Sequence, residues 1–155
     1  MKSVIVDTNV LVLLIVGQAA PEKIGSHRRL RAFDEADFRN LSKLLSQFGK
    51  HITVPNVLTE ASNLIGSGDQ EIAPGCCEAL GVYGCKTAET YIESKQVICS
   101  EDYLELGLAD AAVISAAMRS RSEVITTDRK LFGTLESHGA RTHNLFHFKT
   151  PARYE

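Results

Sequence analysis

The stretch SVIVDTNVLVLLIVG, residues 3–17, determines the fold class of this 155-residue chain. Val4 to Val6 form a β-branched apolar run that is typical of a buried strand. The apolar run from Thr8 to Val16 then suits a helix that Gly17 stops. A buried strand that leads directly into a helix is typical of α/β proteins, and Asp7 falls at the carboxyl end of that strand.

The rest of the chain continues this alternation of strands and helices. Further strands are predicted over residues 51–54, 96–99 and 123–127, with a final edge strand over 141–148. Helices are predicted over residues 34–48 with Asp34 as N-cap, 56–66 with Asn56 as N-cap, 106–119 and 129–137. Residues 70–95 read as interrupted helix and residues 18–34 as a polar loop or lid. Strands that alternate with helices predict an α/β fold with a parallel sheet covered on both faces.

Composition and charge narrow the class of protein. Hydrophobic residues make up 44% and charged residues 23%, which allows a real core and excludes wholesale disorder. No apolar run reaches the roughly 18 residues that span a membrane. Asp7 and Asn9 interrupt the region where a signal peptide would be apolar, so a cytoplasmic location is expected. The four cysteines form no CxxC pair, which argues against zinc and for reduced thiols.

The net charge of -2 bears on nucleic-acid binding. It argues against a protein that coats nucleic acid through bulk positive charge. It does not exclude an enzyme that acts on nucleic acid at one site.

Four acidic residues are each predicted to follow a different strand. Asp7 and Asp128 come directly after strands, Glu60 lies in the helix after the second strand, and Asp110 opens the helix after the third. Because ligands bind at the carboxyl edge of a parallel sheet, we expect these four side chains in one crevice. Glu60 and Asp110 also have apolar neighbours, where a charge is costly unless it is paired or bound to a cation.

Such a group of carboxylates predicts a metal site. Four like charges in one crevice repel each other and raise each other's pKa, and a divalent cation removes this repulsion. Oxygen ligands alone favour Mg²⁺ or Mn²⁺ over zinc, and either metal supports hydrolysis of phosphodiesters. Each residue taken singly also has a simpler explanation, as a helix cap, a solvated residue or an acid near a helix N-terminus. The hypothesis therefore depends on all four occurring together.

Four motifs in a fixed order make the chain similar to the PIN-domain family. They are IVDTNVLV at 5–12, LTEASNLI at 58–65, LADAAVISAA at 108–117 and VITTDRKLF at 124–132. The resemblance extends over nearly the whole chain. It implies a single PIN-like domain over residues 1–155, with three α/β/α layers around a central parallel sheet. It also implies a ribonuclease that depends on Mg²⁺ or Mn²⁺.

The same resemblance implies roles for individual residues. It assigns Asp7, Glu60, Asp110 and Asp128 to catalysis, with Asp7, Asp110 and Asp128 as metal ligands. Glu60 would bind the metal or orient the attacking water. Two further residues match the family motifs, and we expect them to support the ligands rather than bind the metal: Asn9 and Thr127.

Partners are predicted partly from the resemblance and partly from charge. Many small PIN proteins are VapC-like toxins, usually dimers inhibited by a partner, which implies a homodimer, an antitoxin protein and an RNA substrate. The segment between Asp7 and Glu60 is longer than in compact toxins, so a PIN-like role of another kind stays open. Phosphate contacts are predicted for five basic residues: Arg28, Arg29, Arg31, Arg129 and Lys130.

Two other functions are compatible with parts of this pattern. A catalytically silent PIN-like module could bind RNA or a protein, although it would have no reason to keep four repelling carboxylates together. A phosphatase of the haloacid-dehalogenase type also begins with a strand and an aspartate. Its DxD motif needs a second aspartate at the position of Asn9, so the match fails there.

Overall fold

A parallel sheet lies at the centre of the computed structural model, which describes residues 1–148 and the side chains of residues 1–146. Within this range five strands pair in the order β3-β2-β1-β4-β5. They are β1 (Ser3–Val6), β2 (Lys50–Thr53), β3 (Ala88–Glu89), β4 (Glu123–Thr126) and β5 (Thr142–Asn144). The strand order reverses between β1 and β4, and α/β sheets form their ligand crevice at such a point, outside the carboxyl ends of the strands.

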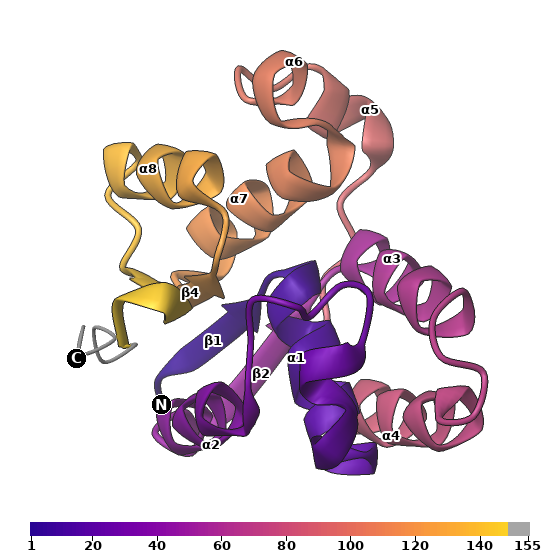
Figure 1. Ribbon diagram of the computed structural model, residues 1–155. Helices are drawn as coiled ribbons and strands as arrows, with labels where there is room; N and C mark the ends of the chain where they lie inside the picture. Colours follow the sequence, from indigo (N-terminus) through magenta and orange to yellow (C-terminus); the bar gives the residue numbers. More distant parts are fainter. Residues whose placement is uncertain (149–155) are drawn as a thin grey trace.

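Helices cover both faces of this sheet, so the predicted three-layer α/β/α architecture is confirmed (Figure 1). On one side, α1 (Thr8–Ala19) is surrounded by α2 (Glu35–Leu45), α3 (Pro55–Gly66) and α4 (Ala73–Lys86). On the other side lie α7 (Leu108–Ser120) and α8 (Arg129–Ser137). Two short helices, α5 (Ser94–Ile98) and α6 (Tyr103–Leu106), pack against α7.

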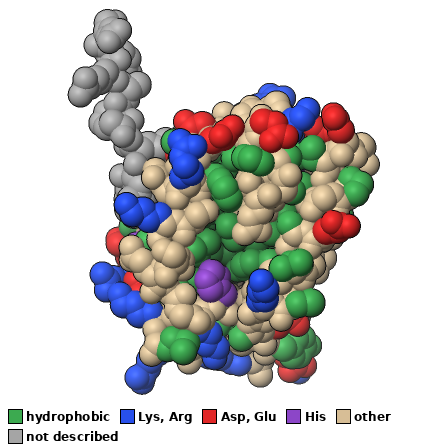
Figure 2. Space-filling model, turned by 90° about the horizontal axis from the view of Figure 1, so that it is seen from below, with side chains coloured by type: hydrophobic (Ala, Val, Ile, Leu, Met, Phe, Trp, Pro, Cys, Tyr) green, Lys and Arg blue, Asp and Glu red, His purple; other side chains and the backbone are tan. Residues whose placement is uncertain are grey.

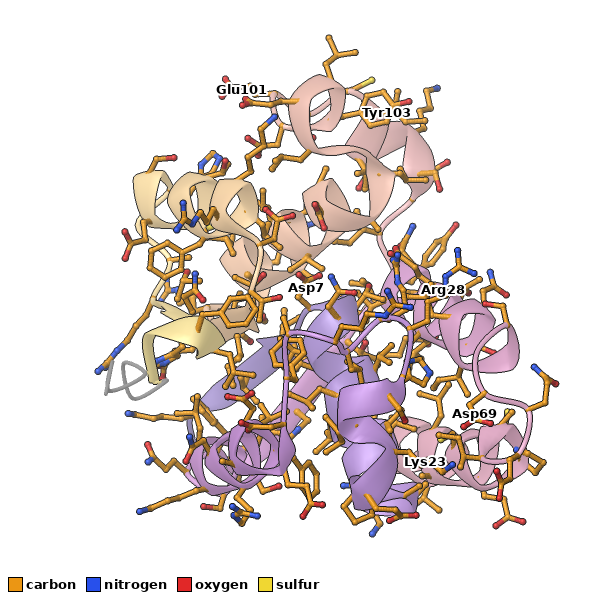
Figure 3. The ribbon with its side chains drawn as sticks, viewed as in Figure 1. Asp7, Lys23, Arg28, Asp69, Glu101 and Tyr103 are labelled. Carbon is orange, nitrogen blue, oxygen red and sulfur yellow. The ribbon has the colours of Figure 1, made fainter. Side chains whose placement is uncertain are left out.

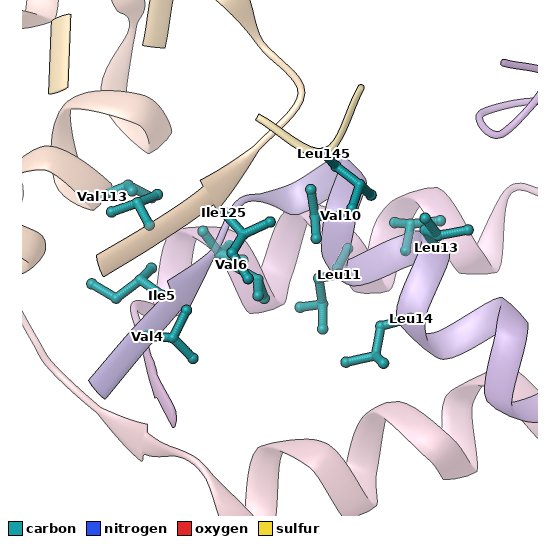
Figure 4. Close-up of a cluster of buried hydrophobic side chains, with 14 of the residues drawn as sticks. Val4, Ile5, Val6, Val10, Leu11, Leu13, Leu14, Val113, Ile125 and Leu145 are labelled. Carbon is teal, nitrogen blue, oxygen red and sulfur yellow. The ribbon is translucent and has the colours of Figure 1, made fainter. Parts of the chain in front are cut away.

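Helix α1 is buried on all sides. Every residue from Val10 to Val16 is at most 4% exposed. A helix that is apolar all round has no side to present to water, so it must lie inside the protein. Figure 4 shows Leu11 and Leu14 of α1 on one side of the sheet and Val113 of α7 on the other.

The prediction of a polar loop or lid over residues 18–34 holds only in part: residues 27–34 form a loop, whereas residues 18–19 end α1 and a 3₁₀ helix after them packs onto α1. The segment contains the 3₁₀ helix η1 (Pro21–Ser26), and three of its apolar side chains are buried: Ile24, Leu30 and Phe33. The exposed charges between these positions hide the apolar contacts in the sequence. The segment ends at Asp34, which caps α2 as predicted, in a reciprocal capping box with Asp37.

Gly17 lies inside α1, which continues to Ala19, so its predicted role as a helix stop is wrong. A Cβ atom at residue 17 would overlap the ring of Phe38 in α2. The glycine therefore allows α2 to approach α1 closely.

The predicted third strand over residues 96–99 is also wrong. These residues belong to α5 and the turn after it, with Val97 buried. The strand that pairs with β2 is β3, in which Ile52 lies opposite Ala88. A short apolar run is compatible with either structure, and the two exposed residues of β3 carry no strand pattern.

The other differences concern the ends of elements. Helix α3 begins at Pro55 and not at a cap formed by Asn56, because proline fits the first helical turn. Helix α4 runs without interruption through its glycines. Helix α7 begins only after Gly107, whose φ of 83° separates it from α6. The predicted edge strand over 141–148 is a strand only at Thr142–Asn144, and a 3₁₀ turn follows it.

Several predictions about the whole chain meet the structure only in part. Residues 149–155 of the predicted single domain lie outside the described residues. None of the helices in residues 1–148 has the length and the apolar character to cross a membrane.

All four cysteines are free thiols, and Cys76 is the buried one.

The close contact between Gly17 and Phe38 predicts that a larger side chain at residue 17 destabilises the protein. Gly17→Ala should lower the free energy of unfolding by about 1–3 kcal/mol, because the new methyl group forces the two helices apart. The measurement is denaturant unfolding followed by circular dichroism. Gly133→Ala in α8 is the matched control, because a Cβ atom there meets no other atom within 4 Å. That control should be neutral or stabilising by up to about 1 kcal/mol. Equal effects of the two substitutions would contradict this account.

Candidate metal centre

Asp7 is the buried centre of the candidate site. Its side chain follows β1 and is only 5% exposed. One carboxylate oxygen accepts a hydrogen bond from the backbone N–H of Thr8 at 2.7 Å. The other accepts a hydrogen bond from the hydroxyl of Thr126 at 2.8 Å. These two bonds fix the orientation of the carboxylate. Figure 3 shows Asp7 at the start of α1.

The electrostatic environment of Asp7 disfavours its negative charge. Burial is the main cause that raises the pKa of Asp7, and the charges of Asp128 and Glu60 raise it further. The hydrogen bonds from Thr126 and Thr8 act in the opposite direction without reversing the shift. No cationic side chain contributes to these shifts.

Asp110 shares this environment from the other side of the sheet. It lies half-buried in the first turn of α7. Burial raises the pKa of Asp110 to about 7, with added repulsion from Asp7, Asp128 and Glu60. The structure thus brings the four predicted carboxylates within electrostatic reach of one another, although they come from four separate segments.

The other two carboxylates, Asp128 and Glu60, are exposed. One oxygen of Asp128 accepts a hydrogen bond at 3.0 Å from the backbone N–H of Leu131, so Asp128 also caps α8. Glu60 lies in the middle of α3, which contacts α7. Because Asp128 and Glu60 are exposed to solvent, their side chains have room to adopt other rotamers. The buried side chain of Asp7 has no such room.

Thr126 is a site residue that sequence reasoning missed. Its hydroxyl donates to Asp7 and accepts a hydrogen bond at 3.0 Å from the backbone N–H of Asp128, so it joins the two carboxylate segments. The signal lies in the register, because Val6 pairs with Ile125 and the next residues, Asp7 and Thr126, are therefore neighbours. The predicted supporting residues Asn9 and Thr127 are half-buried, and neither side chain forms a hydrogen bond within the described part of the chain.

The four carboxylates are the type of ligand that a hard divalent cation prefers, but in this structure they lie too far apart to bind one ion together. Within residues 1–148, no three His, Cys, Asp or Glu side chains are close enough to hold one ion. The donors are nevertheless all carboxylate oxygens, which Mg²⁺ and Mn²⁺ prefer. Binding would require the exposed Asp128 and Glu60 to turn towards the fixed Asp7.

The predicted basic residues fall into two groups. Arg129 and Lys130 are exposed at the start of α8, directly after Asp128. Arg28, Arg29 and Arg31 are exposed on the loop before α2, and Figure 3 shows Arg28 on this loop. Arg28 and Arg29 line a small cavity against the end of α3. Arg129 and Lys130 therefore adjoin one of the four carboxylates along the chain, whereas the loop arginines do not.

Comparisons with known proteins support the fold alone. No protein-family model matches the chain, and no curated protein matches it. A solved structure, a domain of a functionally unknown protein from Methanocaldococcus jannaschii DSM 2661, is similar with a TM-score of 0.51 and 16% sequence identity. The match covers 100% of this chain and 96% of that chain. At this identity the likeness extends to the arrangement of helices and strands and not to the chemistry of the site.

The raised pKa of Asp110 predicts a pH-dependent effect of removing its charge. An acid whose pKa rises on folding destabilises the protein progressively as pH increases from its unfolded value of 3.8 to about 7. Asp110→Asn should therefore increase the free energy of unfolding above pH 7, by about 1–2 kcal/mol because the carboxyl is partly solvated. The same substitution should give no such gain near the unfolded value of 3.8. Urea unfolding across this pH range measures both effects.

A matched variant separates this effect from a general change in net charge. Glu101→Gln removes one negative charge from an exposed turn far from Asp7 (Figure 3). It should leave the difference between high and low pH unchanged. A gain from Asp110→Asn that is equal at both ends of the pH range would show that folding does not raise the pKa of Asp110.

Proposed function

We propose that this protein is a ribonuclease that depends on Mg²⁺ or Mn²⁺ and hydrolyses RNA phosphodiester bonds at Asp7, Glu60, Asp110 and Asp128. The observation that carries the proposal is the grouping of these carboxylates: burial raises the pKa of Asp7 and of Asp110, the other carboxylates raise both pKa values further, and no cationic side chain offsets either shift. A protein does not need such a group for stability. The similarity of four motifs to the PIN-domain family supports RNA as the substrate.

The proposed role of each carboxylate follows from its burial. Asp7, held by hydrogen bonds from Thr8 and Thr126, would be the fixed metal ligand, and Asp110 and Asp128 would complete the ligand set. A bound Mg²⁺ or Mn²⁺ supplies water activation and stabilises negative charge on the phosphate. Glu60, exposed on α3, would bind the metal or orient the attacking water by accepting its hydrogen bond. The expected products carry a 3′-hydroxyl and a 5′-phosphate.

The biological setting follows from the same resemblance and is a separate part of the proposal. The protein would act in the cytoplasm as the toxin of a toxin–antitoxin pair, as a homodimer that an antitoxin protein inhibits. A small antitoxin-like gene directly upstream of its gene would support this role. A PIN-like module that binds RNA without cutting it is the alternative, and it is favoured by the open spacing of the carboxylates.

Removal of the fixed carboxylate should abolish cleavage and leave the fold intact. In Asp7→Asn the amide oxygen still accepts from Thr8, and the amide nitrogen can donate to Thr126, so local hydrogen bonding survives. Cleavage of a fluorescently labelled single-stranded RNA in Mn²⁺ should fall by about 100-fold or more, since even residues that only orient metal ligands cost up to about that much. The same reaction with a chelator should be inactive for the wild-type chain.

Two controls make this result decisive. Glu101→Gln, on an exposed turn, should cleave at the wild-type rate. Thermal unfolding with and without Mn²⁺ tests metal binding separately, because a ligand that binds only the folded state raises its stability. Metal-dependent cleavage that persists in Asp7→Asn would refute the mechanism. A wild-type chain that neither cleaves RNA nor responds to Mn²⁺ would favour the silent module.

The basic residues beside Asp128 should contribute to RNA affinity through phosphate contacts. In the inactive Asp7→Asn background, Arg129→Ala with Lys130→Ala should weaken RNA binding and reduce the salt dependence of the affinity by about one power of salt per lost contact. Fluorescence anisotropy at several salt concentrations measures this slope. Arg39→Ala is the control, because Arg39 lies on α2 and pairs with Glu35. An unchanged slope would remove Arg129 and Lys130 from the interface.

A further inference from the structure

A second cavity lies between α2 and α4 and is floored by α1. Its volume is about 420 Å³, within the range of about 300–1,000 Å³ that small-molecule sites occupy. It lies away from the carboxylates, because its strand residue, His51, is near the start of β2, whereas Asp7 and Asp128 follow the ends of their strands. The lining residues come from α1, α2, β2 and α4 and from the turns that follow α2 and α4.

The walls of this cavity combine an apolar surface with a polar side. Leu14, Leu45, Phe48 and Val82 form the apolar part. Val82 is 55% exposed at the rim, whereas Leu14, Leu45 and Phe48 are buried. Figure 2, which views the molecule from this side, shows hydrophobic side chains in the middle of the face with charged side chains around them.

Two buried polar atoms on the cavity wall have no hydrogen-bond partner. They are Nδ1 of His51 and the hydroxyl oxygen of Tyr83; the side chain of Thr87 lies near this hydroxyl, but its hydrogen bond goes to the backbone oxygen of Tyr83. Their rings meet edge to face, with centroids 6.1 Å apart. A buried polar atom left without a partner lowers the stability of the fold, so a bound group that offers a hydrogen bond here would be favoured.

Both rings are neutral at physiological pH. Burial lowers the pKa of His51, and burial raises the pKa of Tyr83 to about 12, an effect that the nearby Thr87 only partly offsets. Tyr83 is therefore a hydrogen-bond donor, and His51 can donate from one ring nitrogen. Both can donate to an acceptor in the cavity without carrying a charge themselves.

The only charged residue that lines the cavity in the described structure is cationic. Lys86 lies exposed in the last turn of α4, and no acidic side chain of residues 1–146 forms an ion pair with it. The remaining polar lining is uncharged: Gln18, Ser42, Ser46 and Thr87. The cavity therefore offers hydrogen bonds and one positive charge and no compensating negative charge.

We propose that this cavity binds a small amphipathic anion. Its apolar body would pack on Leu14, Leu45 and Phe48, and its acidic group, a carboxylate or a phosphate monoester, would face Lys86. The acidic group would accept a hydrogen bond from Tyr83 or His51. This site is independent of the ribonuclease activity proposed above, because it shares no residue with the carboxylate cluster.

Three probes with one common apolar body test the charge preference. They are 2-naphthoate, 2-naphthyl phosphate and the cation 2-naphthylmethylammonium, each titrated into the full chain. Chemical shifts of the His51 ring and the Val82 methyl groups report binding at the cavity itself. Both anions should shift these signals saturably, and the cation should bind more weakly by at least about threefold. The tighter of the two anions identifies the acidic group.

Variants test whether the anions occupy the cavity. Lys86→Gln should weaken the anions by about three- to fivefold and should not weaken the cation, because it removes the like charge that repels the cation, whereas Lys95→Gln on α5 should have no effect. Ser42→Trp should fill the cavity from the exposed side of α2, and Val82→Trp should block it from the rim. Thermal unfolding confirms that each variant is folded. No saturable shift with either anion, equal binding of the cation, or anion binding that survives both tryptophan variants would overturn the proposal.

Discussion

The burial of one carboxylate between two apolar elements is the constraint on which the candidate site depends. Asp7 connects β1, whose last three residues are at most 1% exposed, to α1, which has almost no solvent-facing side. A charge at this junction loses its hydration, and two hydrogen bonds do not restore it. The nearest additional charges are negative. The compensation must therefore come from a proton or from a cation supplied by the solution, and Mg²⁺ or Mn²⁺ suits the oxygen donors.

The sequence predicted those parts of the fold in which the apolar residues of a segment are also the residues that the structure buries. The strand–helix pair at the N-terminus is apolar at nearly every position, so its central place could be predicted without knowledge of its neighbours. Failures arose where a short segment takes its structure from tertiary contacts. The two residues of β3 are held in place by pairing with β2, and the run at residues 96–99 was too short to distinguish strand from helix. The prediction that Gly17 ends its helix failed for a related reason, because the role of this glycine depends on Phe38 in another helix.

The candidate site shows the same division between local and tertiary information. Asp7 and Asp128 could be placed at one sheet edge from their position after strands, and the structure brings Glu60 and Asp110 into electrostatic contact with them. Thr126 could not be recognised without the register between β1 and β4. The cavity beside α1 was out of reach for the same reason, since His51 and Tyr83 are far apart in sequence and neither belongs to a recognisable motif.

Helix capping and metal binding are two explanations for Asp7 that the structure allows us to weigh. Asp7 does cap α1, and Asp128 caps α8, so capping alone could account for an aspartate after each strand. A cap stabilises the charged carboxylate through backbone N–H groups and by itself lowers the pKa. At Asp7 the net shift is upward, because burial and the neighbouring carboxylates outweigh the hydrogen bonds. An asparagine would cap the helix without this electrostatic cost, so capping explains a polar residue at position 7 but not a negatively charged one.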